Sequence, residues 1–307
     1  MISIGFENPT ALVLSIPFLA TLVLLYRRSR KKFSTIVERL GLARSPKLVA
    51  LLTALKLCTA IAIAIAAAQP YLEIYEPVKV SINNVLELNT SAVELLILLD
   101  VSKSMGYVDN GIKRFEIATK VLEELLRIVK RDRVTVAVFA KDVEIVCRNA
   151  SISCLNKLQS IELRRYSAIG NAIVFAVSYA KASSLPVAAI LITDGANNYG
   201  TPPKNALRYA NESGLALVPI IVGSDPRAYD FEKACRDLGI EIRRVGTHVD
   251  EKLLKDLVED AYREAKYVAL KVRGMLYAYV AKRDYGPTLV ATILALVLFL
   301  ASILEGV

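Results

Sequence analysis

Three long runs of apolar residues stand out in the pattern of hydrophobic and polar positions, two near the start of the chain and one at its end. They cover residues 9–26, 48–68 and 287–304, and the only charge within them is that of Lys56. A transmembrane helix needs roughly 17–25 apolar residues at a rise of about 1.5 Å each. A buried core helix or a cleaved signal peptide would be similarly apolar, but charges flank each run and no basic residue precedes the first. The pattern therefore predicts three membrane-spanning helices.

Between the second and third runs, short runs rich in β-branched residues alternate with amphipathic helical patterns. The predicted strands are 93–100, 133–140, 142–146, 186–193, 215–222 and 240–245, and the predicted helices are 113–130, 170–182, 203–212, 231–238 and 251–264. Alternating strands and helices are typical of α/β proteins. We predict a doubly wound, mostly parallel, Rossmann-like sheet, in which ligands bind beyond the carboxyl ends of the strands.

The predicted chain therefore has seven parts. In order these are an N-terminal transmembrane helix, a loop, a second transmembrane helix, a linker, the α/β domain, a second linker and a C-terminal transmembrane helix. Their bounds are 1–26, 27–47, 48–70, 71–92, 93–265, 266–285 and 286–307. Since a charge within a membrane is costly, Lys56 should face another helix or extend toward the head groups.

The loop between the first two apolar runs is strongly basic and sets the expected orientation. It holds one acid, Glu38, and eight cations, namely Arg27, Arg28, Arg30, Lys31, Lys32, Arg39, Arg44 and Lys47. Because short basic loops stay on the cytoplasmic side of a membrane, we expect residues 27–47 inside the cell and the α/β domain outside it. Lys282 and Arg283, just before the third run, argue for the opposite orientation but are outnumbered.

The overall charge changes the expected partners. The chain carries a formal net charge of +9, and its pI is about 9.3. Because most of the excess comes from the basic loop beside predicted membrane helices, it indicates contact with membrane lipids. We therefore expect a multi-pass protein of the cell membrane and no nucleic-acid partner.

Polar side chains follow the ends of two predicted strands. In ELLILLDVSKSMGY, residues 94–107, an apolar strand ends at Asp100 and is followed by Ser102 and Ser104. In AAILITDGANNYG another strand ends before Asp194, and in RRYSAIGNAIVFA a polar turn places Ser167 before a helix. Two carboxylates and three hydroxyls could thus meet at one edge of the sheet, a hard-oxygen set suited to Mg²⁺. The alternative is that these residues only build turns.

These motifs, in this order, resemble the metal-ion-dependent adhesion site (MIDAS) of von Willebrand factor type A domains. RDRVTVAVFAKDVEIV is similar to the second and third strands of that family, and LALVPIIVGSD to a late strand, so the resemblance covers about 93–265. It implies that Mg²⁺, or Mn²⁺ or Ca²⁺, is held by one set of side chains. This set comprises Asp100, Ser102, Ser104, Ser167, where the family usually has threonine, and Asp194. It also implies that a protein partner supplies an Asp or Glu ligand to the ion.

The whole arrangement of spans, basic loop and domain resembles the membrane-anchored Bacteroides aerotolerance family. That resemblance implies a role in adhesion or envelope complex assembly. It also implies partners, namely a MoxR-like AAA+ ATPase and other type A membrane proteins.

Two further functions remain as alternatives. One is a structural membrane scaffold that needs no metal. The other is a phosphotransferase like the haloacid dehalogenases, in which a second Asp follows the nucleophilic Asp by two residues. Here that position is Ser102, which cannot transfer protons near neutral pH. We therefore expect no enzyme activity.

Four cysteines complete the candidate chemistry. Cys147 and Cys154 would lie outside the cytoplasm, where a disulfide between them is plausible. Cys58 and Cys235 are expected to be packing residues. His248 is the only histidine, so the sequence excludes sites built from several histidines.

Overall fold

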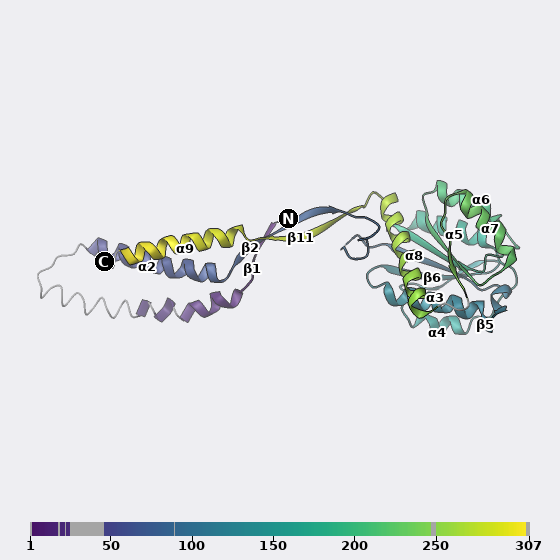
Figure 1. The fold of residues 1–307 in the computed structure, drawn as a ribbon, viewed down its shortest axis with the longest axis horizontal. Coiled ribbons are helices and arrows are strands. Elements are labelled where there is room, and N and C mark those ends of the chain that lie inside the picture. Colours follow the sequence, from purple (N-terminus) through teal and green to yellow (C-terminus); the bar gives the residue numbers. More distant parts are fainter. Residues whose placement is uncertain are drawn as a thin grey trace, which may run out of the picture. The chain divides into compact units, whose positions relative to one another are not determined.

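The computed structural model describes residues 2–17, 19–21, 23–24, 46–88, 90–246 and 250–304 (Figure 1). The chain forms two compact units, which we call the terminal unit, Met1–Pro77 with Tyr279–Val307, and the central unit, Val78–Ala278. Most of the predicted basic loop, residues 27–45, lies outside the described residues, as do His248 and residues 305–307.

The central unit is built on a six-stranded sheet of order β10-β9-β8-β3-β6-β7. The strands are β3 Glu94–Asp100, β6 Arg133–Phe139, β7 Val143–Cys147, β8 Val187–Thr193, β9 Ala216–Val222 and β10 Arg243–Val245. Neighbouring strands are parallel except for the pair β6–β7, which is antiparallel. The predicted α/β class with a mostly parallel sheet is therefore confirmed for this unit.

Helices cover both faces of this sheet. They are α3 Arg114–Ile128, α4 Cys154–Gln159, α5 Ile169–Ala182, α6 Pro203–Glu212, α7 Tyr229–Asp237 and α8 Glu251–Val272. Two short 3-10 helices, η1 Lys103–Gly106 and η2 Pro226–Ala228, and a small hairpin, β4 Val108–Asp109 with β5 Ile112–Lys113, complete the unit.

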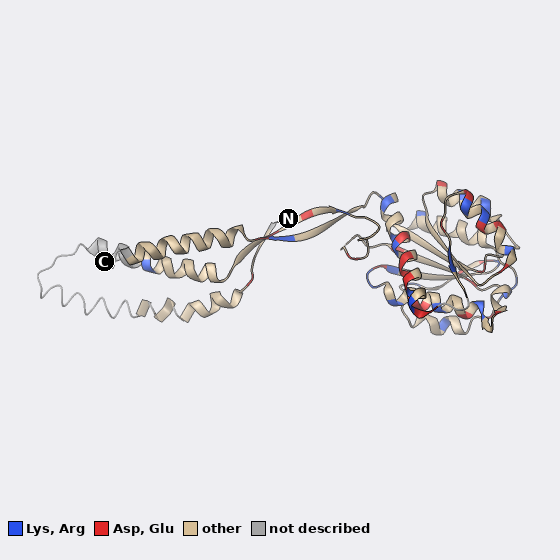
Figure 2. Cartoon of the chain, viewed as in Figure 1, with Lys and Arg blue, Asp and Glu red and all other residues tan. Residues whose placement is uncertain are grey.

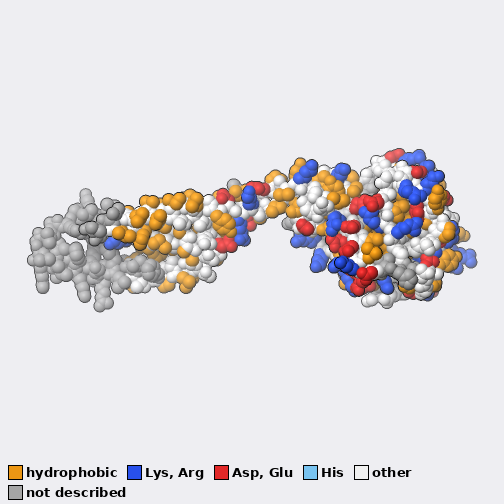
Figure 3. All heavy atoms as spheres, viewed as in Figure 1, with side chains coloured by type: hydrophobic (Ala, Val, Ile, Leu, Met, Phe, Trp, Pro, Cys, Tyr) orange, Lys and Arg blue, Asp and Glu red, His pale blue; other side chains and the backbone are white. Residues whose placement is uncertain are grey.

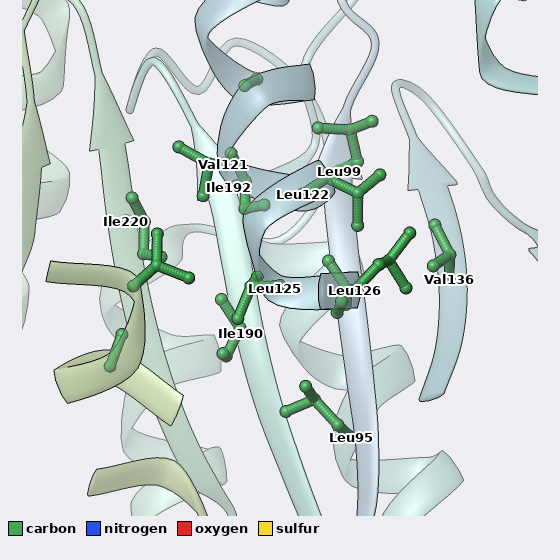
Figure 4. Close-up of a cluster of buried hydrophobic side chains, with 14 of the residues drawn as sticks. Leu95, Leu99, Val121, Leu122, Leu125, Leu126, Val136, Ile190, Ile192 and Ile220 are labelled. Atoms are coloured by element: carbon green, nitrogen blue, oxygen red, sulfur yellow. The ribbon is translucent and has the colours of Figure 1, made fainter. Parts of the chain in front are cut away.

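Strand β3 is buried on both faces, which explains why its sequence is a continuous apolar run rather than an alternating one. Leu95, Ile97 and Leu99 pack in one core cluster with α3 and α8, part of which Figure 4 shows. Leu96 and Leu98 pack in a second cluster with α5, α6 and α7. Burying one such side chain stabilises the folded state by about 1.5–3 kcal/mol. Because β3 buries side chains in both clusters, it is the central support of the fold.

The strand order reverses at β3, because the chain continues to β6 on one side of it and later to β8 on the other. In doubly wound sheets, ligands bind beyond the carboxyl ends of the strands at such a point. Asp100 is the last residue of β3 and Thr193 the last residue of β8. The fold thus brings these two residues to the edge where a ligand site is expected.

The terminal unit combines a small sheet with apolar helices. Its sheet has the order β1-β2-β11, from β1 Ile2–Phe6, β2 Pro70–Lys79 and β11 Tyr277–Asp284, and its helices include α2 Pro46–Ala67 and α9 Gly286–Leu304. Helices α2 and α9 pack together, and the hydroxyl of Thr59 lies 3.1 Å from Ser302 Oγ and 3.3 Å from the carbonyl oxygen of Leu298. These helices show few charges in Figure 2 and an apolar surface in Figure 3.

The two segments predicted as linkers are partly regular structure. Strand β2 lies largely within 71–92, while β11 and the last residues of α8 lie within 266–285. These segments therefore contain strands that the sequence pattern did not predict. Because β2 and β11 pair with each other from opposite ends of the chain, no local pattern could show that each strand has a partner.

One described helix is long and apolar enough to cross a membrane, Gly286–Ile303. In the terminal unit, the described residues also include two shorter apolar helical stretches, Pro9–Thr21 and Ala54–Ala67, the second of which is part of α2. The structure thus supports one membrane span where the apolar runs predict three. An apolar run shows only that a helix is suited to a membrane by length and composition, because the core helix of a soluble protein is equally apolar.

Candidate functional site

The side chain of Asp100 is the centre of the candidate site. It is completely buried and accepts hydrogen bonds from the backbone N–H of Ser102 at 2.8 Å, from Ser167 Oγ at 3.1 Å and from Thr193 Oγ1 at 2.7 Å. These donors come from three separate places in the chain, namely the segment after β3, the segment before α5 and the end of β8. The structure therefore brings Asp100, Ser102 and Ser167 together, as the sequence predicts.

Ser102 directly precedes the short helix η1 beyond β3, and Ser104 lies within it. Their hydroxyl oxygens are 3.0 Å apart. The backbone N–H of Lys103 donates to the carbonyl of Arg164 at 2.8 Å, and the N–H of Arg164 donates to the carbonyl of Val101 at 2.8 Å. This short parallel bridge fixes the loop that carries Ser167 beside the loop that carries the two serines.

Ser167 is held from the opposite side by two asparagines. Its backbone N–H donates to Asn198 Oδ1 at 2.9 Å, and the N–H of Ile169 donates to Asn197 Oδ1 at 2.9 Å. The N–H of Asn198 in turn donates to the carbonyl of Ser167 at 3.0 Å. Sequence reasoning did not single out these asparagines, although two of them shortly after a strand-end carboxylate are a usable signal.

Asp194 is completely buried, but it differs from Asp100 because a cation contacts it. Its Oδ1 accepts from the N–H of Ala196 at 3.0 Å, and its Oδ2 lies 3.1 Å from Nη1 of Arg114. The same Nη1 lies 2.7 Å from Asp225 Oδ2, and Nε of Arg114 lies 2.9 Å from Asp109 Oδ2. A buried arginine therefore ties the β8 loop to the β9 loop and to the small hairpin.

Sequence reasoning missed Arg114, Asp109, Asp225 and Thr193. For Arg114 a signal existed: it is three, four and seven residues before Ile117, Ala118 and Val121, which are buried on α3, so it falls on the apolar stripe of that helix. An arginine at such a position requires buried carboxylates as partners. Nothing comparable marks the two carboxylates, because their loops come together only in the folded chain.

Residues 95–197 match the family model of the von Willebrand factor type A domain. These residues form a von Willebrand factor type A domain. The resemblance predicted from the motifs is thereby confirmed. Type A domains typically serve adhesion or interaction rather than catalysis.

Several solved structures are similar to this type A protein. BatB from Bacteroides thetaiotaomicron is 25% identical, over 57% of this chain and 100% of its own, with a TM-score of 0.48. An aerotolerance-related membrane protein from Bacteroides fragilis is 23% identical, over 57% of this chain and 100% of its own, with a TM-score of 0.48. A manganese-loaded TRAP protein from Plasmodium vivax is 15% identical, over 69% of this chain and 80% of its own, with a TM-score of 0.46. No curated protein sequence matches the chain.

The pKa values of the carboxyl groups at and around the candidate site are shifted in different directions. Burial, and after it the negative charge of Asp194, raises the pKa of Asp100 to about 6, although hydrogen bonds from Thr193 and Ser102 oppose the shift. The hydrogen-bonded guanidinium of Arg227 holds the pKa of Asp225 well below its ordinary value. No cation forms an ion pair with Asp100 within the part of the chain that the structure describes.

Most of the oxygen atoms that the candidate site offers to a cation belong to side-chain hydroxyls or carboxylates. Within the described ranges, no group of three or more His, Cys, Asp or Glu side chains is placed to hold a metal ion. The candidate site instead offers two carboxylates and three serine hydroxyls, and Ser104 is its most accessible member. Such a set is compatible with Mg²⁺, which accepts oxygen ligands and keeps several waters.

The central unit contains a disulfide and a free cysteine. Cys147, at the end of β7, and Cys154, at the start of α4, are joined as a disulfide with their Cα atoms 6.2 Å apart. Cys235 is buried in the core and carries a free thiol, whose pKa burial raises to about 12. A buried thiol of this kind is unreactive at neutral pH.

Proposed function

We propose that this protein is anchored in the cell membrane and uses its type A domain to bind a divalent cation and, through it, a carboxylate of a protein partner. The cation is Mg²⁺, with Mn²⁺ or Ca²⁺ as substitutes, and the bound partner serves adhesion or assembly of a complex at the cell envelope. The proposed ligands, direct or through water, are Asp100, Ser102, Ser104, Ser167 and Asp194. The observation that carries the proposal is the convergence of the Ser102 N–H and of the hydroxyls of Ser167 and Thr193, from separate parts of the chain, on the buried carboxylate of Asp100.

The charges at the site support a cation there. A carboxylate that is fully buried beside another carboxylate is costly unless a positive charge compensates it. Arg114 compensates Asp194, while Asp100 has only hydroxyl and N–H donors. A divalent ion beside Asp100 would supply the missing charge and, when bound, a position that attracts an incoming Asp or Glu.

We further propose that the chain crosses the membrane three times, with residues 27–47 in the cytoplasm and the type A domain outside. The described helix Gly286–Ile303 supports one of these crossings. The basic loop supports the orientation, and the Cys147–Cys154 disulfide is compatible with an oxidising compartment outside the cytoplasm. A MoxR-like AAA+ ATPase or other type A membrane proteins are the proposed assembly partners, and the ATPase would contact the cytoplasmic face.

The proposed role is binding rather than catalysis. Asp100 lies where an aspartate nucleophile of a phosphotransferase would lie, but the acid two residues later is replaced by Ser102. A hydroxyl with an ordinary pKa is a poor general acid or base. Turnover of a generic phosphoester by the pure protein would contradict this part of the proposal.

Thermal unfolding of the full chain in detergent, with Mg²⁺ or with chelator, tests the metal proposal. A ligand at one hundred times its Kd stabilises a protein by about 2.7 kcal/mol, which corresponds to a Tm rise of roughly 5–10 °C for a domain of this size. We expect this rise in the natural protein and its loss in Ser104→Ala, which removes one accessible hydroxyl without disturbing the core. Asp237→Asn, at an exposed position on α7, is the control and should keep the rise. An equal Mg²⁺ response in Ser104→Ala and in the natural protein, or none in either, would overturn the proposal and favour a metal-independent scaffold.

A further inference from the structure

Three exposed tyrosines adjoin residues of the candidate metal site in the chain or by contact. We call Tyr107, Tyr166 and Tyr199 the aromatic rim; their exposed fractions are 56%, 48% and 39%. The rings of Tyr166 and Tyr199 lie against each other, with centroids 5.1 Å apart. Tyr107 directly follows η1, the helix that contains Ser104, and its ring centroid is 5.5 Å from the guanidinium carbon of Arg114. Large aromatic side chains are thus left in solvent beside the oxygens proposed to hold the cation.

The tyrosine pair is fastened to the site by the backbone. Tyr166 directly precedes Ser167, and the N–H of Tyr199 donates to the carbonyl of Ser167 at 3.2 Å. Tyr166 has a φ of 70°, a left-handed conformation that is unfavourable for a bulky residue. Such conformations cost about 1–3 kcal/mol and occur most often at functional sites, where the surrounding structure holds them in place. Here the cost maintains a ring at the surface rather than in the core.

Two cations adjoin the rim and the site. Nζ of Lys141 lies 5.5 Å from the ring centroid of Tyr199, within the range of a cation–π contact. Lys103 stands between Ser102 and Ser104 in the chain and is exposed. Among the described residues, no carboxylate forms an ion pair with either lysine. One exposed acid, Asp142, adjoins Lys141 in the chain.

We propose that the aromatic rim, with Lys103 and Lys141, is the docking surface for an acidic segment of the partner protein. This inference rests on the proposed function, since the partner's first carboxylate would go to the cation and further carboxylates to the two lysines. Tyrosines contribute strongly to binding at the centres of protein interfaces, and charges at the edge of an interface set the choice of partner and the association rate. The surface therefore selects partners in which several carboxylates follow one another.

Fluorescence anisotropy of a labelled peptide of alternating glutamate and glycine, added to the full chain in detergent with Mg²⁺, tests this surface. The matched peptide contains glutamine in place of glutamate. We expect the acidic peptide to bind and the glutamine peptide to bind at least about tenfold more weakly. Tyr199→Ala and Tyr166→Asn should each weaken binding of the acidic peptide about tenfold. Asparagine is chosen at position 166 because it tolerates a left-handed backbone, so the loop should keep its fold.

Charge variants on one loop sharpen the test. Lys141→Gln should weaken binding of the acidic peptide about threefold, and Asp142→Asn should strengthen it by about the same factor, since the two change the local charge in opposite directions. Both effects should shrink at high salt, because exposed charges are screened.

The chain contains a matched control at the far end of helix α5. Nζ of Lys181 lies 4.8 Å from the ring centroid of Tyr209, another exposed tyrosine. Tyr209→Ala and Lys181→Gln remove the same kinds of groups and should leave peptide binding unchanged. No binding of the acidic peptide, equal binding of both peptides, or equal losses in the control variants would overturn the docking surface.

The two proposals fail in different ways. Tyr199-dependent binding that persists in chelator would support the docking surface and contradict a role for the cation. A Mg²⁺-dependent rise in Tm with no effect of the rim variants on peptide binding would contradict the docking surface and leave the metal site standing.

Discussion

The two ends of the central sheet each hold a buried aspartate, and the two are treated very differently. At the amino end, Asp132 lies 2.9 Å from Nζ of Lys266 and accepts hydrogen bonds from the N–H of Val93 at 3.0 Å and from the hydroxyl of Tyr262. At the carboxyl end, Asp100 is equally buried but has only uncharged donors. We interpret Asp132, whose charge Lys266 compensates, as part of the scaffold. A buried carboxylate left without a cation is a candidate for binding a cation from outside.

The largest expected effect on stability comes from breaking the buried ion pair between Asp132 and Lys266. Asp132→Asn leaves Lys266 buried without its counter-charge, and loss of one partner of a buried ion pair costs about 3–5 kcal/mol. Urea unfolding of the full chain in detergent should show this loss in the free energy of unfolding. A loss below about 1 kcal/mol, as expected for the exposed Asp237→Asn, would mean that the pair is not part of the scaffold.

Replacing the aspartate at the carboxyl end of the sheet by asparagine should raise the stability of the protein instead of lowering it. In chelator at pH 7, Asp100→Asn removes a charge that burial disfavours. Because the pKa of Asp100 is raised from 3.8 to about 6, and one unit corresponds to about 1.4 kcal/mol, the gain is at most roughly 3 kcal/mol. A higher Tm in chelator, together with no response to Mg²⁺, is the expected result. A clear loss of stability in chelator would show that Asp100, like Asp132, is a scaffold residue.

The smallest expected effect concerns Asp225, whose charge is compensated inside the chain by Arg227 and Arg114. Its lowered pKa means that the ionised form is favoured by the fold. The stabilisation it provides is therefore present above the ordinary aspartate pKa of about 4 and is lost as the pH falls below that value. Thermal unfolding from pH 7 to pH 3 should show a steeper loss of Tm in the natural protein than in Asp225→Asn. An equal loss of Tm with falling pH in both proteins would contradict the compensation of the Asp225 charge by Arg227 and Arg114.

The part of the site that could be read from the sequence is the part that depends on single strands. Asp100 and Asp194 follow apolar runs long enough to be buried strands, and the carboxyl ends of parallel strands meet at one edge. Arg114, Asp109 and Asp225 could not be combined in this way, since a helix, a hairpin and a later loop meet only through the packing of α3 and β9 on the sheet. The strands within the two linker segments could not be predicted for the same reason, because β2 and β11 have no partner within their own stretch of chain.

By itself, the sequence determined the alternation of strands and helices, the apolar ends of the chain and the polar residues at the strand tips, since each is a property of neighbouring residues. Only the tertiary structure decided which buried carboxylate receives a cation from the chain and which does not. Charge compensation acts through space over a few ångströms, and Lys266 and Arg114 reach Asp132 and Asp194 from distant parts of the sequence. Asp100 is left without such a partner, and this difference directs the proposed cation to the carboxyl end of β3.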